Sequence, residues 1–397
     1  MTKHVYENGK KKPAILGGEP MFTSPLGIVR PLFPELTAIA EQVSEILRTG
    51  QLTNLWKNVP ALESELCQYL QVPHCVAVAN GTLGLMLALT GSKLAGEVIV
   101  PSFTFSATAH ALWWAGLEPV FADINPDTFT LDPQAVEAAI TPRTSAILAV
   151  HVYGHPCDIE GLQAVARQHG LALIFDSAHA FGATYRGQKI GNFGDAEVFS
   201  FHATKIFPTG EGGAITTANA ELAQYLALAR KFGDPGTENT QFCGLNAKMQ
   251  EFNAILGLEN LKTIDQYVEN RRRYAGILTE RLGQLPGLRL QQVCPDVYVN
   301  YQNFAVLIDK AGFGLSRDKL HTALAAENIR ARKYFYPPLH LHQAYAACRE
   351  KCGGNLPITE KVASNILCLP IYSVMSDEML DGICLAMETI HRYAGQL

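Results

Sequence analysis

Lys205 and Asp176 are the two residues of this 397-residue chain whose types and surroundings point most directly to chemistry. Lys205 ends the sequence Ser-Phe-His-Ala-Thr-Lys, and Asp176 ends the apolar run Leu-Ala-Leu-Ile-Phe-Asp. A lysine amine can form a Schiff base with an aldehyde. A carboxylate can keep a pyridine nitrogen protonated, so that the ring accepts the electrons of a carbanion. The pair predicts an enzyme that uses pyridoxal 5′-phosphate (PLP), with both residues catalytic.

Each of the two residues also has an ordinary structural explanation. A lysine is nearly always a solvated surface charge, and an aspartate after a strand often caps the next turn. Apolar neighbours such as Phe201 and Ile206 favour a buried Lys205, and burial lowers the pKa of an amine, as a nucleophile requires. Small residues and His179 follow Asp176. His179 is predicted either to contact the phenolate oxygen of PLP or to orient Asp176.

Three further motifs have groups suited to the rest of the cofactor. The sequence Asn80-Gly81-Thr82 precedes a predicted helix, where backbone N–H groups and a hydroxyl group bind phosphate, but taken alone it is also an ordinary turn. Ser200, on the strand before the lysine, can add a second hydroxyl group. Phe105 can stack on the pyridine ring, although packing in a core explains an aromatic residue equally well.

The elements that must position these residues follow the pattern of an α/β protein with a mostly parallel sheet. Apolar runs predict strands at 76–79, 98–100, 119–123, 146–150, 173–175 and 197–201. Helical patterns at 83–90 and 105–115 separate the first of these strands. Ligands of such sheets gather beyond the carboxyl ends of the strands, where Asn80, Pro101 and Asp176 are expected.

The length of the chain favours more than one domain. We predict an N-terminal segment, residues 1–40, that packs on a small domain, a large PLP-binding domain over residues 41–265, and a small α+β C-terminal domain over residues 266–397. A helical stretch at 249–267 leads out of the large domain. The small domain is predicted to contain a strand at 303–308, a helix that Ser316 caps, and a last helix at 377–393.

The composition argues against several other classes of protein. The formal net charge is −5 without long basic runs, which disfavours nucleic acid and anionic membranes as partners. The first residues do not resemble a signal peptide, and the apolar windows are too short to span a bilayer. Nine cysteines without a CxxC pair indicate a reducing, cytoplasmic location and predict no metal site.

Taken together, the motifs resemble the DegT/DnrJ/EryC1/StrS family of PLP-dependent nucleotide-sugar aminotransferases, and the resemblance covers nearly the whole chain. It begins at residues 50–54 and includes the motifs at 80–82, 101–105, 176–182 and 200–205. Segments 121–124, 244–251 and 332–337 belong to the same set. The match looks closest to the branch that acts on the 4-keto carbon of dTDP-4-keto-6-deoxyglucose.

The resemblance implies a type I PLP aminotransferase fold and a homodimer with active sites at the subunit interface. It implies that Lys205 binds PLP and shuttles a proton, that Asp176 pairs with the pyridinium nitrogen, and that Phe105 and His179 lie against the ring. Other residues are implied to hold the phosphate group (Gly81, Thr82, Leu83, Ser200, and Asn246 acting from the other subunit) and to line the sugar site (Tyr336, His340).

The implied reaction is transamination of a nucleotide-linked 4-keto-6-deoxy sugar, dTDP-4-keto-6-deoxyglucose, with L-glutamate as amino donor, giving a 4-amino-4,6-dideoxy sugar nucleotide. The sequence Thr209-Gly210-Glu211 also occurs in relatives that use GDP-sugars, so GDP and UDP stay open. Family members with histidine in place of the lysine are dehydratases, and Lys205 argues against that chemistry. The alternatives are amination of a 3-keto sugar nucleotide, a lyase or racemase on the same fold, and a PLP-binding regulator without turnover.

Overall fold

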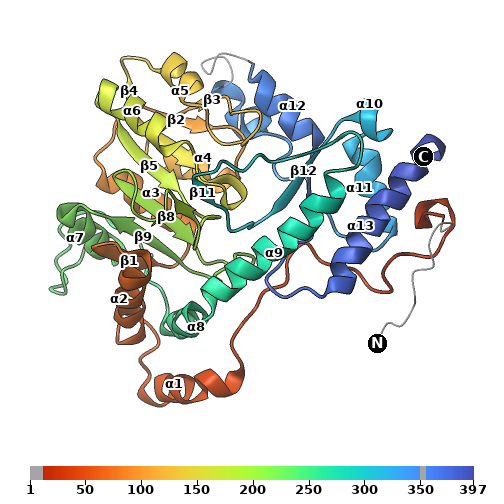
Figure 1. Ribbon diagram of the computed structural model, residues 1–397. Helices are drawn as coiled ribbons and strands as arrows, with labels where there is room; N and C mark the ends of the chain where they lie inside the picture. Colours follow the sequence, from red (N-terminus) through yellow and green to blue (C-terminus); the bar gives the residue numbers. More distant parts are fainter. Residues whose placement is uncertain (1–11, 349–354) are drawn as a thin grey trace.

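A seven-stranded sheet is the central element of the computed structural model, which describes residues 12–348 and 355–397 (Figure 1). Its strands are β1 (His74–Val78), β2 (Glu97–Pro101), β3 (Glu118–Ala122), β4 (Thr144–Val150), β5 (Ala172–Asp176), β8 (Ala196–Ser200) and β9 (Gly213–Thr217). The order is β1-β9-β8-β5-β4-β2-β3, and every pair is parallel except those that β9 makes with β1 and β8. The predicted mostly parallel α/β sheet is confirmed, with β9 as an addition.

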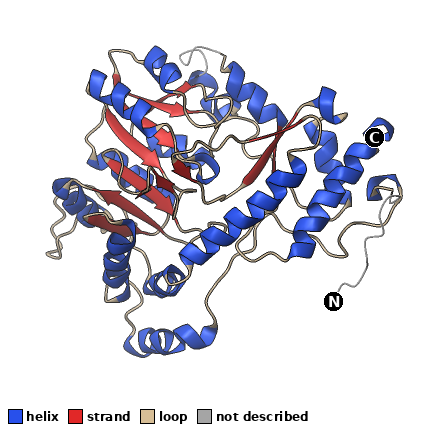
Figure 2. Cartoon of the chain, in the orientation of Figure 1, coloured by secondary structure: helices blue, strands red, loops and turns tan. Residues whose placement is uncertain are grey.

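Helices cover both faces of this sheet (Figure 2). Alternate residues of one strand enter different cores: Ile99 of β2 packs into one core, whereas Val98 and Val100 pack into the other. The core of Ile99 includes residues of α2 (Asn58–Leu70), α5 (Pro133–Ala139), α6 (Ile159–His169) and α8 (Glu251–Leu261). The opposite core includes residues of α3 (Gly81–Gly91), α4 (Ser106–Trp114) and α7 (Ala220–Ala229).

The helix α1 (Leu36–Thr49) lies outside these layers, at the bottom of Figure 1. Its buried residues Ile39 and Ile46 pack against Ile255 of α8. Helix α1 therefore touches the main body through one apolar stripe, as expected of an amphipathic surface helix.

The predicted helical stretch at 249–267 is two helices, which corrects the sequence-based assignment. Helix α8 ends at Leu261, and α9 (Ile264–Leu282) begins after Thr263, whose φ of −121° interrupts the helix. The side-chain amide of Asn260, at the end of α8, donates to the Pro208 carbonyl oxygen at 2.7 Å, which fixes the end of α8 on the sheet side. The predicted boundary near residue 266 falls within the first turn of α9.

Beyond α9 the chain forms a second, antiparallel sheet of β10 (Leu288–Leu290), β12 (Phe304–Ile308) and β13 (Ile366–Leu369). Its helices are α10 (Lys310–Phe313), α11 (Arg317–Ala326), α12 (Pro357–Asn365) and α13 (Asp377–Arg392). The predicted cap is present, since the Ser316 hydroxyl oxygen accepts a hydrogen bond from the Lys319 N–H at 3.3 Å. A separate hydrophobic core joins α9, α11 and α13 to this sheet.

The described part of the N-terminal segment lies against α11. The Glu327 carboxylate accepts hydrogen bonds from the N–H groups of Ala14 at 2.7 Å and Met21 at 2.8 Å, and Leu26 pairs with Ile329. Residues 1–11 of the predicted segment lie outside the described residues. The division of the chain into domains stays a prediction.

A third, small sheet joins distant parts of the chain. Strands β6 (Thr184–Tyr185) and β7 (Gln188–Lys189) follow Asp176 in sequence, and β11 (Val297–Tyr298) pairs with β6. The segment after β11 is thereby brought to the loop that follows Asp176. Across the described residues, no helix combines the length and apolar character needed to cross a bilayer.

Candidate active site

Asp176 is a buried carboxylate at the carboxyl end of β5, with an exposed fraction of 5%. Its Oδ2 accepts a hydrogen bond from the Thr108 hydroxyl at 2.8 Å, and its Oδ1 accepts one from the Ala178 N–H at 3.1 Å. Burial raises the pKa of Asp176, while the two hydrogen bonds and the charge of Lys205 act in the opposite direction. Both donors favour the carboxylate form, which is the form that would pair with a pyridinium nitrogen.

Lys205 lies in the loop that connects β8 to the antiparallel strand β9. Burial lowers the pKa of its amine to about 8, although the nearby charge of Asp176 acts to raise it. At that pKa about a tenth of the amine is neutral at pH 7, compared with under about one part in a thousand for an ordinary lysine. Lys205 is half-buried and not a fully solvated surface charge, and the amine is suited to act as a nucleophile and a proton carrier.

The loop that carries Lys205 is held at both ends by backbone hydrogen bonds. Phe201 N–H donates to the Gly212 carbonyl at 2.8 Å, Ala203 N–H to the Gly210 carbonyl at 2.8 Å, and Thr209 N–H to the Phe201 carbonyl at 2.8 Å. Strand β9, which the sequence analysis missed, supplies the second end of this loop. A short run of small and β-branched residues, Gly-Ala-Ile-Thr-Thr, was the signal for it.

The start of α3 lies against the end of β8 and has the features of an anion site. The Asn80 side chain accepts from the Leu83 N–H at 2.9 Å, so Asn80 is the N-cap of α3. The N–H groups of Gly81 and Thr82 have no partner within the helix, because they belong to its first turn. A Cβ atom on Gly81 would lie 3.0 Å from the Cβ of Ser200, so glycine is needed for this close approach.

Leu83 does not fit its predicted role at the phosphate group. Its N–H is already used by the Asn80 side chain, and its own side chain packs against the hydrophobic core on that face of the sheet. Of the predicted phosphate contacts, Gly81 and Ser200 lie close together, and Thr82 follows Gly81 in the same first turn of α3.

His179 is held as a neutral ring. Burial lowers the pKa of His179 well below its usual range, and the charge of Lys205 acts in the same direction. Its Nδ1 accepts a hydrogen bond from the Tyr153 N–H at 3.2 Å, which leaves the ring hydrogen on Nε2. The ring of Phe335 lies parallel to it, with 6.2 Å between the centroids and 13° between the planes. Sequence reasoning missed Tyr153 and Phe335, which come from distant segments.

Two residues at the start of α4, Phe105 and Thr108, concern the site around Asp176. Phe105, the N-cap, has an aromatic side chain that is 61% exposed, so it is not the core residue that the alternative explanation required. Thr108, three residues later, donates to Asp176. The helix turn that holds Asp176 therefore begins at Phe105, whose ring is exposed. Thr108 was not predicted, because a threonine inside a helix gives no signal of its own.

Tyr336 and Asn246 make contacts that involve neither Lys205 nor Asp176. Tyr336 has a 51% exposed ring that faces the guanidinium carbon of Arg317 at 4.5 Å. Asn246 is exposed, and its Oδ1 accepts from the Lys248 amine at 2.7 Å. Its predicted role across a subunit interface remains a prediction.

The predicted sugar contact of His340 is corrected by the structure. Its ring is 2% exposed, its Nδ1 lies 2.6 Å from the Ser102 hydroxyl oxygen, and its Nε2 lies 3.2 Å from Glu360 Oε1. A ring with both nitrogens bonded and almost no accessible surface cannot contact a ligand in this conformation. His340 instead fixes the loop after β2, because its own N–H also donates to the Ser102 hydroxyl oxygen at 3.0 Å.

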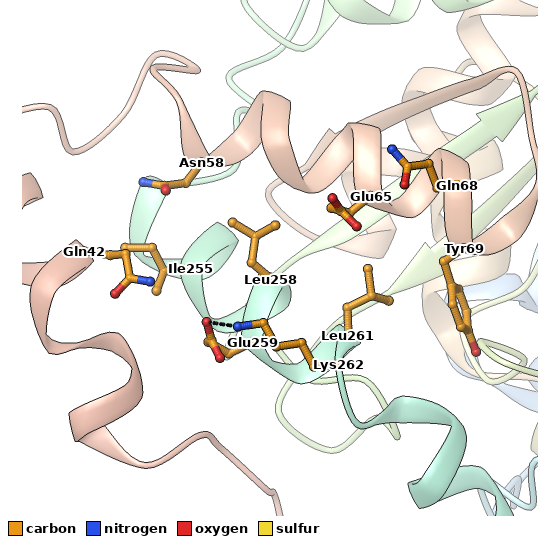
Figure 3. Close-up of a pocket in the computed structure, with 10 residues that line it drawn as sticks. All are labelled: Gln42, Asn58, Glu65, Gln68, Tyr69, Ile255, Leu258, Glu259, Leu261 and Lys262. Carbon is orange, nitrogen blue, oxygen red and sulfur yellow. Dashed lines mark hydrogen bonds and ion pairs between the residues drawn. The ribbon is translucent and has the colours of Figure 1, made fainter.

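A cavity of about 650 Å³ lies elsewhere, between α1, α2 and α8 (Figure 3). Figure 3 shows that its polar lining includes the ion pair of Glu259 and Lys262, whose atoms are 2.6 Å apart. None of the predicted site residues lines it. The chemistry is therefore assigned to the strand ends and not to this cavity, since the Lys262 amine is a largely exposed surface charge in an ion pair with Glu259, and the buried Asp176 carboxylate and the Lys205 amine lie elsewhere.

The residues at the strand ends fit PLP. The N–H groups in the first turn of α3, which Gly81 lets approach Ser200, suit a phosphate group, the buried Asp176 carboxylate suits a pyridinium nitrogen, and Lys205 has an amine with a lowered pKa. Phosphate, ring and aldehyde are thus each matched by a separate group of this chain.

Comparisons with known proteins identify the family of the chain. The model of the DegT/DnrJ/EryC1/StrS aminotransferase family matches residues 35–388. The chain is 36% identical over 356 residues to a dTDP-4-amino-4,6-dideoxy-D-glucose transaminase of Escherichia coli, covering 89% of this chain and 95% of that protein. It is also 36% identical over 335 residues to a UDP-N-acetyl-3-dehydro-alpha-D-glucosamine 3-aminotransferase of Acidithiobacillus ferrooxidans, covering 83% and 88%.

A solved structure shares the fold over almost its full length. The crystal structure of DesI in the presence of its TDP-sugar product superimposes with a TM-score of 0.88 at 39% identity, covering 96% of each chain. The type I PLP aminotransferase fold that the motifs implied is therefore confirmed, as are the enzyme class and PLP as the cofactor. This chain belongs to the DegT/DnrJ/EryC1/StrS aminotransferase family.

Proposed function

We propose that this enzyme transfers an amino group from L-glutamate to the ketone of a nucleotide-linked 4-keto-6-deoxy sugar, with dTDP-4-keto-6-deoxyglucose as the substrate. The observation that carries the proposal is the buried Asp176 carboxylate beside Lys205, whose amine has a lowered pKa, at the end of the sheet where the first turn of α3 approaches Ser200. The similarity to the Escherichia coli transaminase supports the choice of sugar.

In the proposed mechanism, Asp176 and Lys205 each hold or move a proton at a defined atom. Bound PLP supplies an electron sink for negative charge at the carbon that carries the nitrogen. Asp176 holds a proton on the pyridine nitrogen, and Thr108 and Ala178 orient its carboxylate. The Lys205 amine would move a proton between the substrate carbon that carries the nitrogen and the aldehyde carbon of PLP. General acid–base catalysis of this kind typically contributes about 10²–10⁴-fold in rate.

The other residues of the site bind and orient. The first turn of α3, with Ser200, holds the phosphate group and so fixes the distance from the ring to Lys205. Phe105 covers one face of the ring with its exposed side chain. His179, kept neutral by burial, offers its Nε2 hydrogen to an oxygen of the cofactor or substrate and adds no charge beside Lys205.

We propose that the active unit is a homodimer in the cytoplasm, with Asn246 reaching the phosphate group of the other subunit. The outer face of α1 supports an association surface: Leu36 is 70% exposed and Leu47 is 65% exposed, which is unusual for large apolar side chains. The exposed position of Asn246 leaves its side chain accessible to a second chain.

Amination at C3 of a 3-keto sugar nucleotide is the second candidate. The 36% identity to the 3-aminotransferase of Acidithiobacillus ferrooxidans favours it, and it would use the same Lys205 and Asp176. The two candidates differ only in how the sugar is presented to the amine.

Mass spectrometry of the product decides between them. Purified protein, PLP and L-glutamate are incubated in parallel with dTDP-4-keto-6-deoxyglucose, its GDP-linked counterpart and a 3-keto sugar nucleotide, with Lys205→Ala as the inactive control. We expect an aminated product from the dTDP-linked 4-keto sugar. An amine formed only on the 3-keto or GDP-linked sugar would overturn the proposed substrate. Failure of L-glutamate to convert the cofactor to its amine form would overturn the proposed donor.

A further inference from the structure

Two buried carboxamide side chains, those of Asn300 and Gln302, lie between the catalytic segments. They follow β11, which pairs with β6 in the loop beyond Asp176. Asn300 is 0% exposed and Gln302 is 3% exposed. A buried amide group is costly unless it is hydrogen-bonded, so the partners of these two side chains indicate what they hold in place.

Gln302 binds the peptide groups on both sides of Lys205. Its Oε1 accepts a hydrogen bond from the Ile206 N–H at 2.8 Å, and its Nε2 donates to the Thr204 carbonyl oxygen at 3.0 Å. One planar group thus engages the donor after Lys205 and the acceptor before it. The direction in which the Lys205 side chain leaves the backbone is fixed by this pair of bonds.

Asn300 binds the segment of His179 in the same way. Its Nδ2 donates to the carbonyl oxygens of His179 at 2.8 Å and Phe181 at 2.9 Å. Its Oδ1 accepts from the Gln302 N–H at 2.9 Å, which joins the two amides. A Cβ on Gly154 would lie 1.8 Å from that Oδ1, so a glycine at this position makes room for Asn300.

The segment itself is anchored by Arg271 of α9. The Arg271 Nη1 donates to the carbonyl oxygens of Tyr301 at 3.1 Å and Gln302 at 3.2 Å, and its Nε donates to the Ser373 hydroxyl oxygen at 2.9 Å. Arg271 is 3% exposed. The two amides are therefore held from behind by a rigid helix and do not adjust freely to the loops that they contact.

We propose that Asn300 and Gln302 are positioning residues that hold Lys205 and His179 in a single geometry for the cofactor. The inference rests on the assignment of Lys205 under the proposed function. Its alternative is that these amides only satisfy buried backbone groups and so affect stability alone. The two differ in what happens to the reactivity of Lys205 when the fold survives.

The test measures how fast Lys205 captures PLP. In this step Nζ forms a C=N bond with the aldehyde carbon and the aldehyde oxygen leaves as water. Apoprotein of the full chain is mixed with PLP, the rise in visible absorption gives the rate, and reduction with borohydride followed by peptide mass spectrometry identifies the lysine. Gln302→Met keeps the length of the side chain and removes both hydrogen bonds.

Asn260→Leu is the matched control. Asn260 is also a buried amide, 4% exposed, and it donates to the Pro208 carbonyl oxygen in the same loop, but not beside Lys205. We expect Gln302→Met to slow capture by about 10²-fold, the effect of an ångström-scale misplacement, and Asn260→Leu to stay within about twofold of the unsubstituted protein. Circular dichroism and thermal unfolding confirm that each variant is folded.

If Gln302→Met does not fold, Gln302→Asn takes its place, because it keeps a neutral amide group but is one methylene shorter, so the bonds to Ile206 and Thr204 cannot both keep their lengths. A loss of about tenfold in the capture rate is then expected. Equal rates for the variant and the unsubstituted protein, with the label on Lys205, would overturn the positioning role and leave the proposed function intact. An equal loss in Asn260→Leu would also overturn it. A label on a different lysine would overturn the assignment of Lys205 and this inference with it.

Discussion

Thr108 donates a hydrogen bond from its hydroxyl group to Asp176 Oδ2 at 2.8 Å, so the first turn of α4 holds one oxygen of the carboxylate at the end of β5. The Thr104 hydroxyl lies 2.9 Å from that of Thr108 and extends the contact. A hydrogen bond to a charged group contributes about 1.5–3 kcal/mol. Thr108 therefore acts through Asp176 and not on the substrate.

Thr108→Val is expected to lower kcat by about tenfold or more, because the Asp176 carboxylate loses a donor that favours its charged form. Removing that donor raises the pKa of Asp176 further, so the acidic limb of the kcat profile should move to higher pH. The pH dependence of kcat measures both effects. Thr108→Ser keeps a hydroxyl group and should restore the profile. An unchanged acidic limb in Thr108→Val would show that Thr108 does not tune Asp176.

Lys205→Met is expected to make the apoprotein more stable at pH 7. Burial lowers the pKa of Lys205 from its ordinary value of 10.5 to about 8 in the fold, so at pH 7 the folded protein carries a charge that is partly removed from water. Between about pH 8 and about pH 10.5 the folded protein has lost this proton while the unfolded chain keeps it. The free energy of unfolding of the protein with Lys205 therefore rises with pH in this range. The stabilisation by methionine should therefore shrink at alkaline pH.

Urea unfolding of the two apoproteins at neutral and alkaline pH tests this pattern. Lys262→Met is the control, because Lys262 is paired with Glu259 at the surface. Its effect on the unfolding midpoint is not expected to include the cost of a buried charge. A higher unfolding midpoint for Lys205→Met at neutral pH, with a smaller difference at alkaline pH, is the expected result. A lower midpoint at neutral pH would contradict the desolvation of Lys205.

Gly81→Ala is expected to weaken PLP binding by about tenfold, because the added Cβ would lie 3.0 Å from the Ser200 Cβ and would push α3 away from β8. Equilibrium dialysis of the apoprotein against PLP measures the affinity. Gly276→Ala, within α9, is the control: a Cβ there meets nothing within 4 Å, and alanine favours the helix. Equal affinities in the two variants would remove the first turn of α3 from the phosphate site.

Mixed dimers test the proposed role of Asn246 across the subunit interface. Asn246→Asp places a carboxylate where the phosphate group of the other subunit is expected, so this variant and Lys205→Ala should each be nearly inactive alone. After the two are unfolded together and refolded, random pairing gives heterodimers in half of the dimers, each with one unaltered site. About a quarter of the original activity should return. No recovery, with dimers present by ultracentrifugation, would place Asn246 in its own subunit's site, and full activity of Asn246→Asp alone would place it outside the site.

Much of the sheet could be predicted because its strands are buried on both faces. The runs that end at Val100 and Asp176 are continuously apolar, and each proved to be a strand with a polar or turn residue at its carboxyl end. The Asn80 turn and the Ser316 cap were predictable for a similar reason, since local hydrogen bonds depend on neighbouring residues. Lys205 and Asp176 were found because their side-chain chemistry is specific.

The residues that were missed depend on contacts between distant parts of the chain. Gln302 lies 96 residues from Ile206, and Asn300 lies 121 residues from His179. Nothing in the sequence around an asparagine or a glutamine shows that its amide will face a loop so far away. For His340, a local motif predicted a sugar contact, but distant residues determine what its ring contacts. Its two ring nitrogens lie within hydrogen-bond distance of Ser102 and Glu360.

The position of Asn300 and Gln302 limits how enzymes of this kind can be recombined. A chimera joined near residue 266 would take its strand ends from one parent and residues 300–302 from another, and would separate the reactive lysine from the amides that fix its backbone. Arg271 would come with the second parent, so the support would remain while its fit to the Lys205 loop changed. A functional exchange of sugar-binding parts should therefore keep residues 264–303 with the same parent as the seven-stranded sheet.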